Sequence, residues 1–126
     1  MMYSVANFLI LKRIKEQLGL DQCLGFFFGA APLKKASIEY FGSLDMILFN
    51  VYGMSETTGA FTIQTFSKFS FDAAGFAMNG CDLMIANPDE KGEGEICMRG
   101  RNIMMGYLKN EEATKSTIDN QGYVHS

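Results

Sequence analysis

The chain has 126 residues, of which 48% are hydrophobic and 13% aromatic, so it has the size of one domain and enough apolar material for a core. Its formal net charge of -3, without any run of Lys or Arg, argues against a protein that binds nucleic acid. The 3 cysteines are odd in number and widely spaced, which fits a reducing intracellular setting better than a disulfide framework or a metal knuckle.

An amphipathic helix is predicted near the amino end. Apolar residues recur at helical spacing from Val5 to Leu18, and charged residues fall largely between them. Gly19 follows as a left-handed stop. A helix of this kind normally follows a strand in an α/β unit, so we expect the chain to start in the middle of such a unit.

Two buried strands joined by a helix are predicted next. Residues 24–28 and 46–51 are short apolar runs, typical of strands that are buried on both faces of a parallel sheet. A helix from Leu33 to about Leu44 would connect them. A right-handed crossover of this type brings the loops after both strands to one carboxyl edge of the sheet, where ligands of open α/β sheets bind.

Ligand-type side chains are densest directly after the second strand. Tyr52 offers an aromatic face, Gly53 lets another group approach the backbone, and Glu56 carries the one formal charge among several hydroxyls. Carboxylate and hydroxyl oxygens of this kind bind a hard cation such as Mg²⁺ together with its phosphates. From the residues alone, a polar turn without a ligand is an equal alternative.

The second half of the chain predicts short strands separated by turns. Residues 61–64 and 66–71 alternate apolar and polar side chains, as half-exposed strands do. Residues 81–85 and 95–99 predict a hairpin, Asn110 can cap a short helix, and residues 123–125 open a further strand. His125 is the one histidine and is interpreted as a strand residue, so a hydrolytic triad has no candidate members.

Four ordered blocks resemble the core motifs of the adenylate-forming superfamily, which contains acyl-CoA synthetases, amino-acid adenylation domains and beetle luciferases. The blocks are Gly29-Ala30-Ala31-Pro32-Leu33, Tyr52-Gly53-Met54-Ser55-Glu56, Gly94 to Gly100 with Met105-Gly106-Tyr107, and Gly122 to Ser126. Ser55 stands where most members have threonine, and in this respect the second block looks most like the long-chain acyl-CoA synthetases of the bubblegum type.

This resemblance implies an α/β fold that is a central fragment of the large amino-terminal domain of an adenylate-forming enzyme. One parallel β-α-β unit, within residues 1–60, would carry the adenine and Mg-ATP motifs. Residues 61–126 would form part of a small, mainly antiparallel β-barrel that is truncated at its end.

The resemblance also implies roles for the motif residues. In similar enzymes the adenine of ATP lies between a tyrosine, here Tyr52, and the backbone of a loop of small residues. Ser55 matches a position that contacts the phosphates, and Glu56 matches the Mg²⁺-binding carboxylate, so these two are the catalytic candidates. The expected cofactor-binding residues are Gly29, Ala30, Ala31, Asn50, Val51, Tyr52, Gly53, Met54 and Ser55.

The implied parent enzyme is a long-chain fatty acid–CoA ligase. A fatty carboxylate attacks the α-phosphate of Mg·ATP to give acyl-AMP and pyrophosphate, and the thiol of coenzyme A then displaces AMP. The phosphate loop, ribose-binding aspartate and catalytic lysine of similar enzymes are absent from these residues, so the chain alone is expected to be inactive. An amino-acid adenylation domain and a non-catalytic remnant or interaction module stay open as alternatives.

The expected partners are small molecules, namely a long-chain fatty acid, ATP and coenzyme A, with no nucleic acid and no defined protein partner. We expect a cytoplasmic location and leave open a peripheral association with intracellular membranes. The longest apolar runs fall short of the roughly 20 residues that cross a bilayer. Phenylalanines near residues 26–28 and 61–71 would suit either an acyl tunnel or a buried core.

Overall fold

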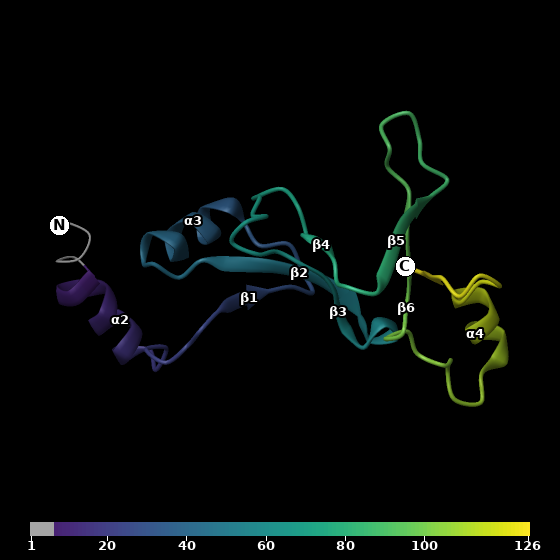
Figure 1. Ribbon diagram of the computed structural model, residues 1–126, viewed down its shortest axis with the longest axis horizontal. Helices are drawn as coiled ribbons and strands as arrows, with labels where there is room; N and C mark the ends of the chain where they lie inside the picture. The colour runs from purple at the N-terminus through teal and green to yellow at the C-terminus, as the bar shows by residue number, and fades with distance from the viewer. Residues whose placement is uncertain (1–6) are drawn as a thin grey trace.

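The computed structural model describes residues 7–126, which form two sheets along an elongated molecule (Figure 1). The first sheet contains β1 (Phe26–Phe28), β2 (Leu48–Met54), β3 (Gly59–Ile63) and β4 (Phe76–Ala77), in that order. Strand β1 pairs in parallel with β2, whereas β3 is antiparallel to both β2 and β4.

The amino-terminal helix is confirmed over part of its predicted length. A π-helical turn, η1 (Asn7–Leu11), leads into α2 (Lys12–Gln17), and Gly19 ends the helical segment with a φ of 69°. Val5, where the predicted pattern begins, lies outside the described residues. The ammonium group of Lys15 lies 2.7 Å from the Asp45 carboxylate, which ties α2 to the turn before β2.

The predicted parallel β-α-β unit is also confirmed. Helix α3 (Lys35–Ser43) connects β1 to β2, and Phe28 at the end of β1 is opposite Asn50 in β2. The expected end of the second strand at Val51 is wrong, because β2 continues to Met54 by pairing with β3 on its other edge. Tyr52 therefore lies within a strand and not in a loop.

The strand expected at residues 66–71 is not formed. Thr65 and Lys68 make an isolated bridge, and the loop packs Phe66 and Phe69 against Phe49, with ring centroids 4.7 and 6.3 Å away. Residues three positions apart on a strand point to opposite faces. The loop conformation is what allows both rings to reach the same apolar partner.

The second sheet contains β5 (Cys81–Ala86), β6 (Glu95–Gly100) and β7 (Val124–His125), with α4 (Glu111–Thr117) between the last two strands in the chain. The hairpin of β5 and β6 is confirmed, and the side chain of Asn110 caps α4 by accepting a hydrogen bond from the Ala113 amide.

The described residues do not close into a barrel, because the two sheets stay open. A barrel requires each edge strand to pair with another strand. In residues 7–126 the strands β1, β4, β5 and β7 each have one paired neighbour within their sheet. The sequence pattern predicted the hairpin of β5 and β6, but such a pattern carries no information on closure.

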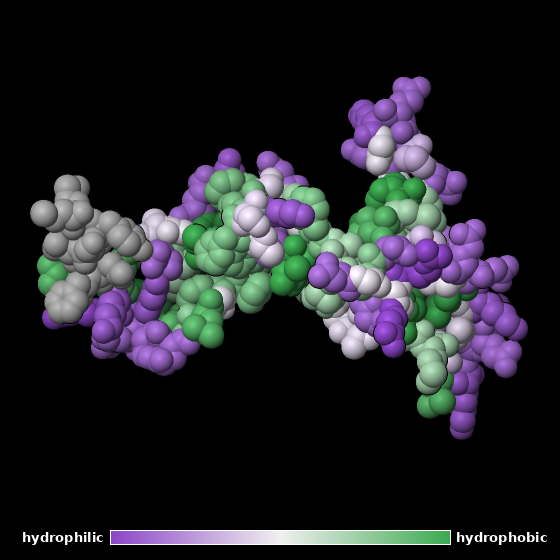
Figure 2. Space-filling model, in the orientation of Figure 1, coloured by the Kyte–Doolittle hydropathy of each residue, from purple (hydrophilic) through white to green (hydrophobic). Residues whose placement is uncertain are grey.

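Each sheet has buried apolar side chains, and many other apolar side chains remain at the surface (Figure 2). Phe49 and Phe61 are buried on the first sheet, and Met98 and Val124 on the second. Leu108, in contrast, is 90% exposed. Apolar surface of this extent favours association with other protein surfaces. No helix within the described part of the chain is long and apolar enough to cross a membrane.

Gln64 is a buried polar residue next to the first sheet, 2% exposed, and its side chain makes several hydrogen bonds. Its side-chain oxygen accepts a hydrogen bond from the Asn50 amide at 2.8 Å. Its side-chain nitrogen donates to the carbonyl oxygens of Ser70 and Ala73. One buried amide thus connects β2 to the loop that carries the phenylalanines.

We expect Gln64→Ala to lower the free energy of unfolding of the chain by about 1 to 3 kcal/mol, because a buried polar group left unpaired costs this much. Urea denaturation followed by circular dichroism measures the change. The matched control is Gln121→Ala at an exposed position, which should be nearly neutral. Equal changes in the free energy of unfolding for the two variants would contradict the stabilising role of the Gln64 hydrogen bonds.

His125 is held between two carboxylates in the second sheet. Its Nδ1 atom lies 2.8 Å from Glu95 Oε2, and its Nε2 atom lies 3.6 Å from Asp119 Oδ2. The hydrogen bond to Glu95 is the main cause that raises the pKa of His125, with Asp119 adding to it. The confirmed strand β7 is thereby fastened to β6 and to the turn before it.

The stabilisation by His125 should depend on pH. Because its pKa is raised on folding, the contribution is complete below the unfolded value of about 6.5 and is lost as pH rises through the folded value. The difference in unfolding free energy between the chain and its His125→Gln variant should therefore be larger at pH 5.5 than at pH 8. A difference that grows toward pH 8 would show that the charged imidazole does not stabilise the fold.

Candidate functional site

A cavity of about 330 Å³ lies beside the second half of β2. It forms because β1 ends opposite Asn50 while β2 continues to Met54, so one edge of β2 loses its neighbour. Its lining residues are Gly29, Ala30, Ala31, Pro32, Asn50, Val51, Tyr52, Gly53 and Ala74. The structure thus brings together the expected cofactor-binding residues, except Met54 and Ser55, around one space.

The loop after β1 packs closely on β2. A Cβ atom on Gly29 would lie 2.6 Å from the carbonyl oxygen of Val51 and 2.8 Å from its Cγ2 atom, so a larger residue would displace the loop. Ala30 follows with a φ of 65°, a left-handed conformation that turns the chain away from the sheet. The small residues of this motif therefore have a packing function as well as a place in the cavity wall.

Gly53 is required by a backbone contact within the sheet. The register of β2 and β3 shifts between Tyr52 and Gly53, and a Cβ atom on Gly53 would overlap the carbonyl oxygen of Gly59. The sequence suggested that Gly53 admits another group close to its backbone. In the structure that group is the neighbouring strand.

Ser55 and Glu56 lie outside the cavity wall, in the 3₁₀ turn η2 (Ser55–Thr57) that joins β2 to β3. Thr57 is fully buried, and its hydroxyl oxygen lies 2.9 Å from the carbonyl oxygens of both Met54 and Gly59. This hydroxyl therefore connects the two ends of the turn on its buried side. Ser55 is left exposed and Glu56 half-buried on its outer side.

Residues 102–107, which we call the strap, follow β6 and cross the outside of η2. Asn102 makes two contacts with the turn, donating from Nδ2 to the Thr57 carbonyl at 3.0 Å and accepting at its own carbonyl from the Thr58 hydroxyl at 2.6 Å. The Met104 amide donates to the carbonyl of Glu56 at 2.8 Å. The strap therefore links the first sheet to the second at the turn that carries the candidate metal ligand.

Tyr107, at the end of the strap, donates a hydrogen bond from its hydroxyl to Glu56 Oε1 at 2.7 Å. This bond is the main cause that lowers the pKa of Glu56 and also raises the pKa of Tyr107, so the carboxylate is ionised and the phenol neutral. The sequence places Tyr107 in a recognisable motif but indicates no role for it. The tyrosine hydroxyl at the end of that motif is the one feature that could have suggested a contact with the site.

The donor set at η2 suits a hard cation. Glu56 provides an ionised carboxylate, and Ser55 beside it provides a hydroxyl oxygen. Within residues 7–126, no side chain other than Tyr107 hydrogen-bonds the Glu56 carboxylate, and the Ser55 hydroxyl has no hydrogen-bond partner. Oxygen atoms of both residues are thus available to Mg²⁺ or to its phosphates.

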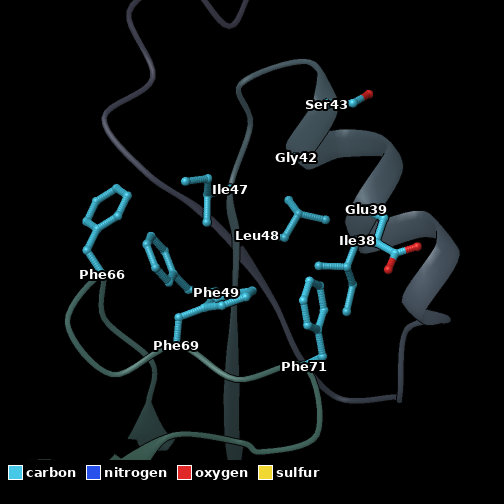
Figure 3. Close-up of a pocket in the computed structure, with 10 residues that line it drawn as sticks. All are labelled: Ile38, Glu39, Gly42, Ser43, Ile47, Leu48, Phe49, Phe66, Phe69 and Phe71. Carbon is cyan, nitrogen blue, oxygen red and sulfur yellow. The ribbon is translucent and has the colours of Figure 1, made fainter.

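A second and larger cavity, of about 500 Å³, lies at the opposite end of β2 (Figure 3). Figure 3 shows Phe49 beside Phe66 and Phe69 of the 66–71 loop, whereas Phe71 of the same loop lies next to Ile38 of helix α3. The polar side chains of its lining are those of Glu39 and Ser43. An apolar space of this kind suits a hydrocarbon chain and the surface of another protein segment equally well, and it holds none of the predicted site residues.

Comparison with known proteins identifies relatives of the chain. The family model for AMP-binding enzyme matches residues 2–108. Long-chain-fatty-acid–CoA ligase ACSBG2 of Gallus gallus is 43% identical over 126 residues, which is 100% of this chain and 16% of that protein. Long-chain-fatty-acid–CoA ligase heimdall of Drosophila melanogaster is 42% identical over 93% of this chain and 17% of that protein. The chain thus spans less than a fifth of the length of these relatives.

Solved structures show the same fold. The apo structure of MatB from Rhodopseudomonas palustris has a TM-score of 0.71 and 26% identity, covering 81% of this chain and 22% of that one. O-succinylbenzoate coenzyme A synthetase (MenE) from Bacillus subtilis, in complex with ATP and magnesium ion, has a TM-score of 0.65 and 25% identity, covering 79% of this chain and 22% of that one.

The expected resemblance to bubblegum-type acyl-CoA synthetases is confirmed by these relatives, whose identity of about 40% extends over the whole chain. The family model covers well over half of the sequence and includes the cavity, the η2 turn and the strap. The chain therefore belongs to the AMP-binding enzyme family and is related to long-chain fatty acid–CoA ligases.

Proposed function

We propose that this chain is the part of a long-chain fatty acid–CoA ligase that holds the adenine and the metal-bound phosphates of ATP. The observation that supports this most directly is the position of the cavity beside Tyr52, at the same end of β2 as the ionised carboxylate of Glu56. A nucleotide base and its phosphates can extend from the cavity toward η2. The ligase relatives and the complex of MenE with ATP and magnesium ion support the same assignment.

The cavity would take the adenine ring. Its volume of about 330 Å³ is at the lower end of the range typical of small-molecule sites. Tyr52 supplies an aromatic face, and the small residues Gly29, Ala30 and Ala31 also line the cavity. Asn50, Val51 and Gly53 form a further part of the wall, and Met54 connects β2 to the η2 turn.

The η2 turn would hold the metal and the phosphates. Glu56 is the proposed Mg²⁺ ligand, and the hydroxyl of Ser55 would donate to a phosphate oxygen. When bound, the metal supplies positive charge to offset the negative charge that develops on the phosphates. The task of the chain's own residues is to keep the carboxylate ionised and in place.

The acid that is activated is proposed to be a fatty acid, with coenzyme A as the acceptor of the acyl group. An amino acid as substrate would need a carboxylate in the pocket for its α-ammonium group. The relatives named above are long-chain fatty acid–CoA ligases, which favours the fatty acid over the amino acid.

The first test concerns adenine binding. Replacing an aromatic side chain that stacks on a base costs about 1 to 3 kcal/mol, so Tyr52→Ala should weaken AMP binding to the chain at least about fivefold. Titration followed by NMR measures affinities in the weak range expected here. Tyr40→Ala is the matched control, because Tyr40 is 61% exposed and lies outside the cavity lining. Equal AMP affinity of the Tyr52 variant and the unsubstituted chain would refute the adenine site.

The second test concerns the reaction. The chain alone, with Mg·ATP, palmitate and coenzyme A, should give no thioester above the blank by mass spectrometry, because several pre-organised contacts of the complete enzyme are lacking. A chimera of the Gallus gallus ligase, in which this chain replaces the matching 126 residues, should support thioester formation. In this chimera Glu56→Gln should lower the rate by roughly 10² or more. Pyrophosphate exchange that depends on amino acids and not on palmitate would favour the adenylation alternative.

A further inference from the structure

The Glu56 side chain is long and lies on a short turn, and contacts from the strap fix its position. The η2 turn has 3 residues, and a glutamate side chain has several rotatable bonds that such a turn does not restrain. The hydroxyl of Tyr107 holds Oε1 at 2.7 Å, and the Met104 amide holds the main-chain carbonyl of the same residue at 2.8 Å. Backbone and side chain of Glu56 are both restrained by the strap.

Tyr107 is itself anchored by helix α4. Its amide donates to the Thr114 hydroxyl at 2.9 Å, and that hydroxyl donates to the Asn110 carbonyl at 2.8 Å. Gly106, directly before it, has a φ of 141°, and a Cβ atom there would lie 2.6 Å from Thr114 Cγ2. The glycine therefore allows the strap to lie against α4, which sets the position of the tyrosine.

We infer that Tyr107 is a positioning residue for Glu56: it holds one carboxylate oxygen so that the other is presented to the divalent cation that accompanies the nucleotide phosphates. The inference rests on the proposed function, since it assigns Glu56 to a metal. A neutral hydroxyl suits this task because it orients the carboxylate without cancelling its charge. Partners of this kind contribute roughly 10- to 100-fold to metal affinity.

Asn102 serves the same purpose by a different route. It holds the Thr57 carbonyl and the Thr58 hydroxyl, so it restrains the turn and makes no contact with the Glu56 carboxylate. Loss of Asn102 should loosen η2 as a whole. Loss of the Tyr107 hydroxyl alone should leave the turn in place and release only the carboxylate.

The experiment compares Tyr107→Phe with Tyr40→Phe in the 126-residue chain. Mn²⁺ replaces Mg²⁺ as the probe, and its binding is followed by paramagnetic broadening of NMR signals from residues 55–57. Tyr107→Phe should weaken Mn²⁺ binding at this turn roughly 10- to 100-fold, and Tyr40→Phe should leave it unchanged. Hydrogen exchange of the Met104 amide should stay slow in both variants, which separates loss of positioning from loss of structure.

Three outcomes would overturn the inference, and they can be told apart. Equal Mn²⁺ affinity of Tyr107→Phe and the unsubstituted chain overturns the positioning role and leaves the proposed function intact. Fast exchange of the Met104 amide in Tyr107→Phe shows that the hydroxyl only stabilises the strap. Absence of Mn²⁺ broadening at residues 55–57 in the unsubstituted chain removes the metal assignment itself, while AMP binding through Tyr52 still tests the adenine site separately.

Discussion

The site depends on how β2 is paired. Its first half pairs with a parallel strand, and its second half pairs with an antiparallel strand on the other edge. Residues 48–50 pair with β1, and residues 51–54 pair with β3 on the other edge. Because β1 stops early, its following loop turns away and leaves a cavity beside Tyr52. Because β3 reverses the chain direction, a tight turn is needed, and this turn carries Glu56.

The glycines of the site show why fold and function are difficult to separate in this sequence. Gly29 must lack a side chain because Val51 lies against it. Gly53 must lack one because the backbone of Gly59 lies against it. Both glycines belong to motifs that also predict ligand binding. The same small residues thus make the sheet and leave the adjoining space open, and substitution of either would disturb both.

The sequence allowed the prediction of those features that depend on local pattern. The β-α-β unit, the β5–β6 hairpin and the Asn110 cap follow from periodicity and capping chemistry. The alternation at residues 66–71 predicts a strand that is not formed, because alternation does not reveal that Phe49 lies within reach of the rings of Phe66 and Phe69. The contact of Tyr107 with Glu56 could not be foreseen either, since the two residues are 51 positions apart and no local rule brings them together.

The strap also has a consequence for the order in which the site forms during protein synthesis. Ribosomes add about 5 to 20 residues per second, so roughly 3 to 10 s separate the appearance of Glu56 from that of Tyr107. The β2 strand, its neighbours and the cavity beside Tyr52 can form in this interval from residues already made. The Glu56 carboxylate acquires its final orientation only once the second sheet and α4 have emerged, so in a nascent chain the cavity beside Tyr52 can form before this carboxylate is held in place.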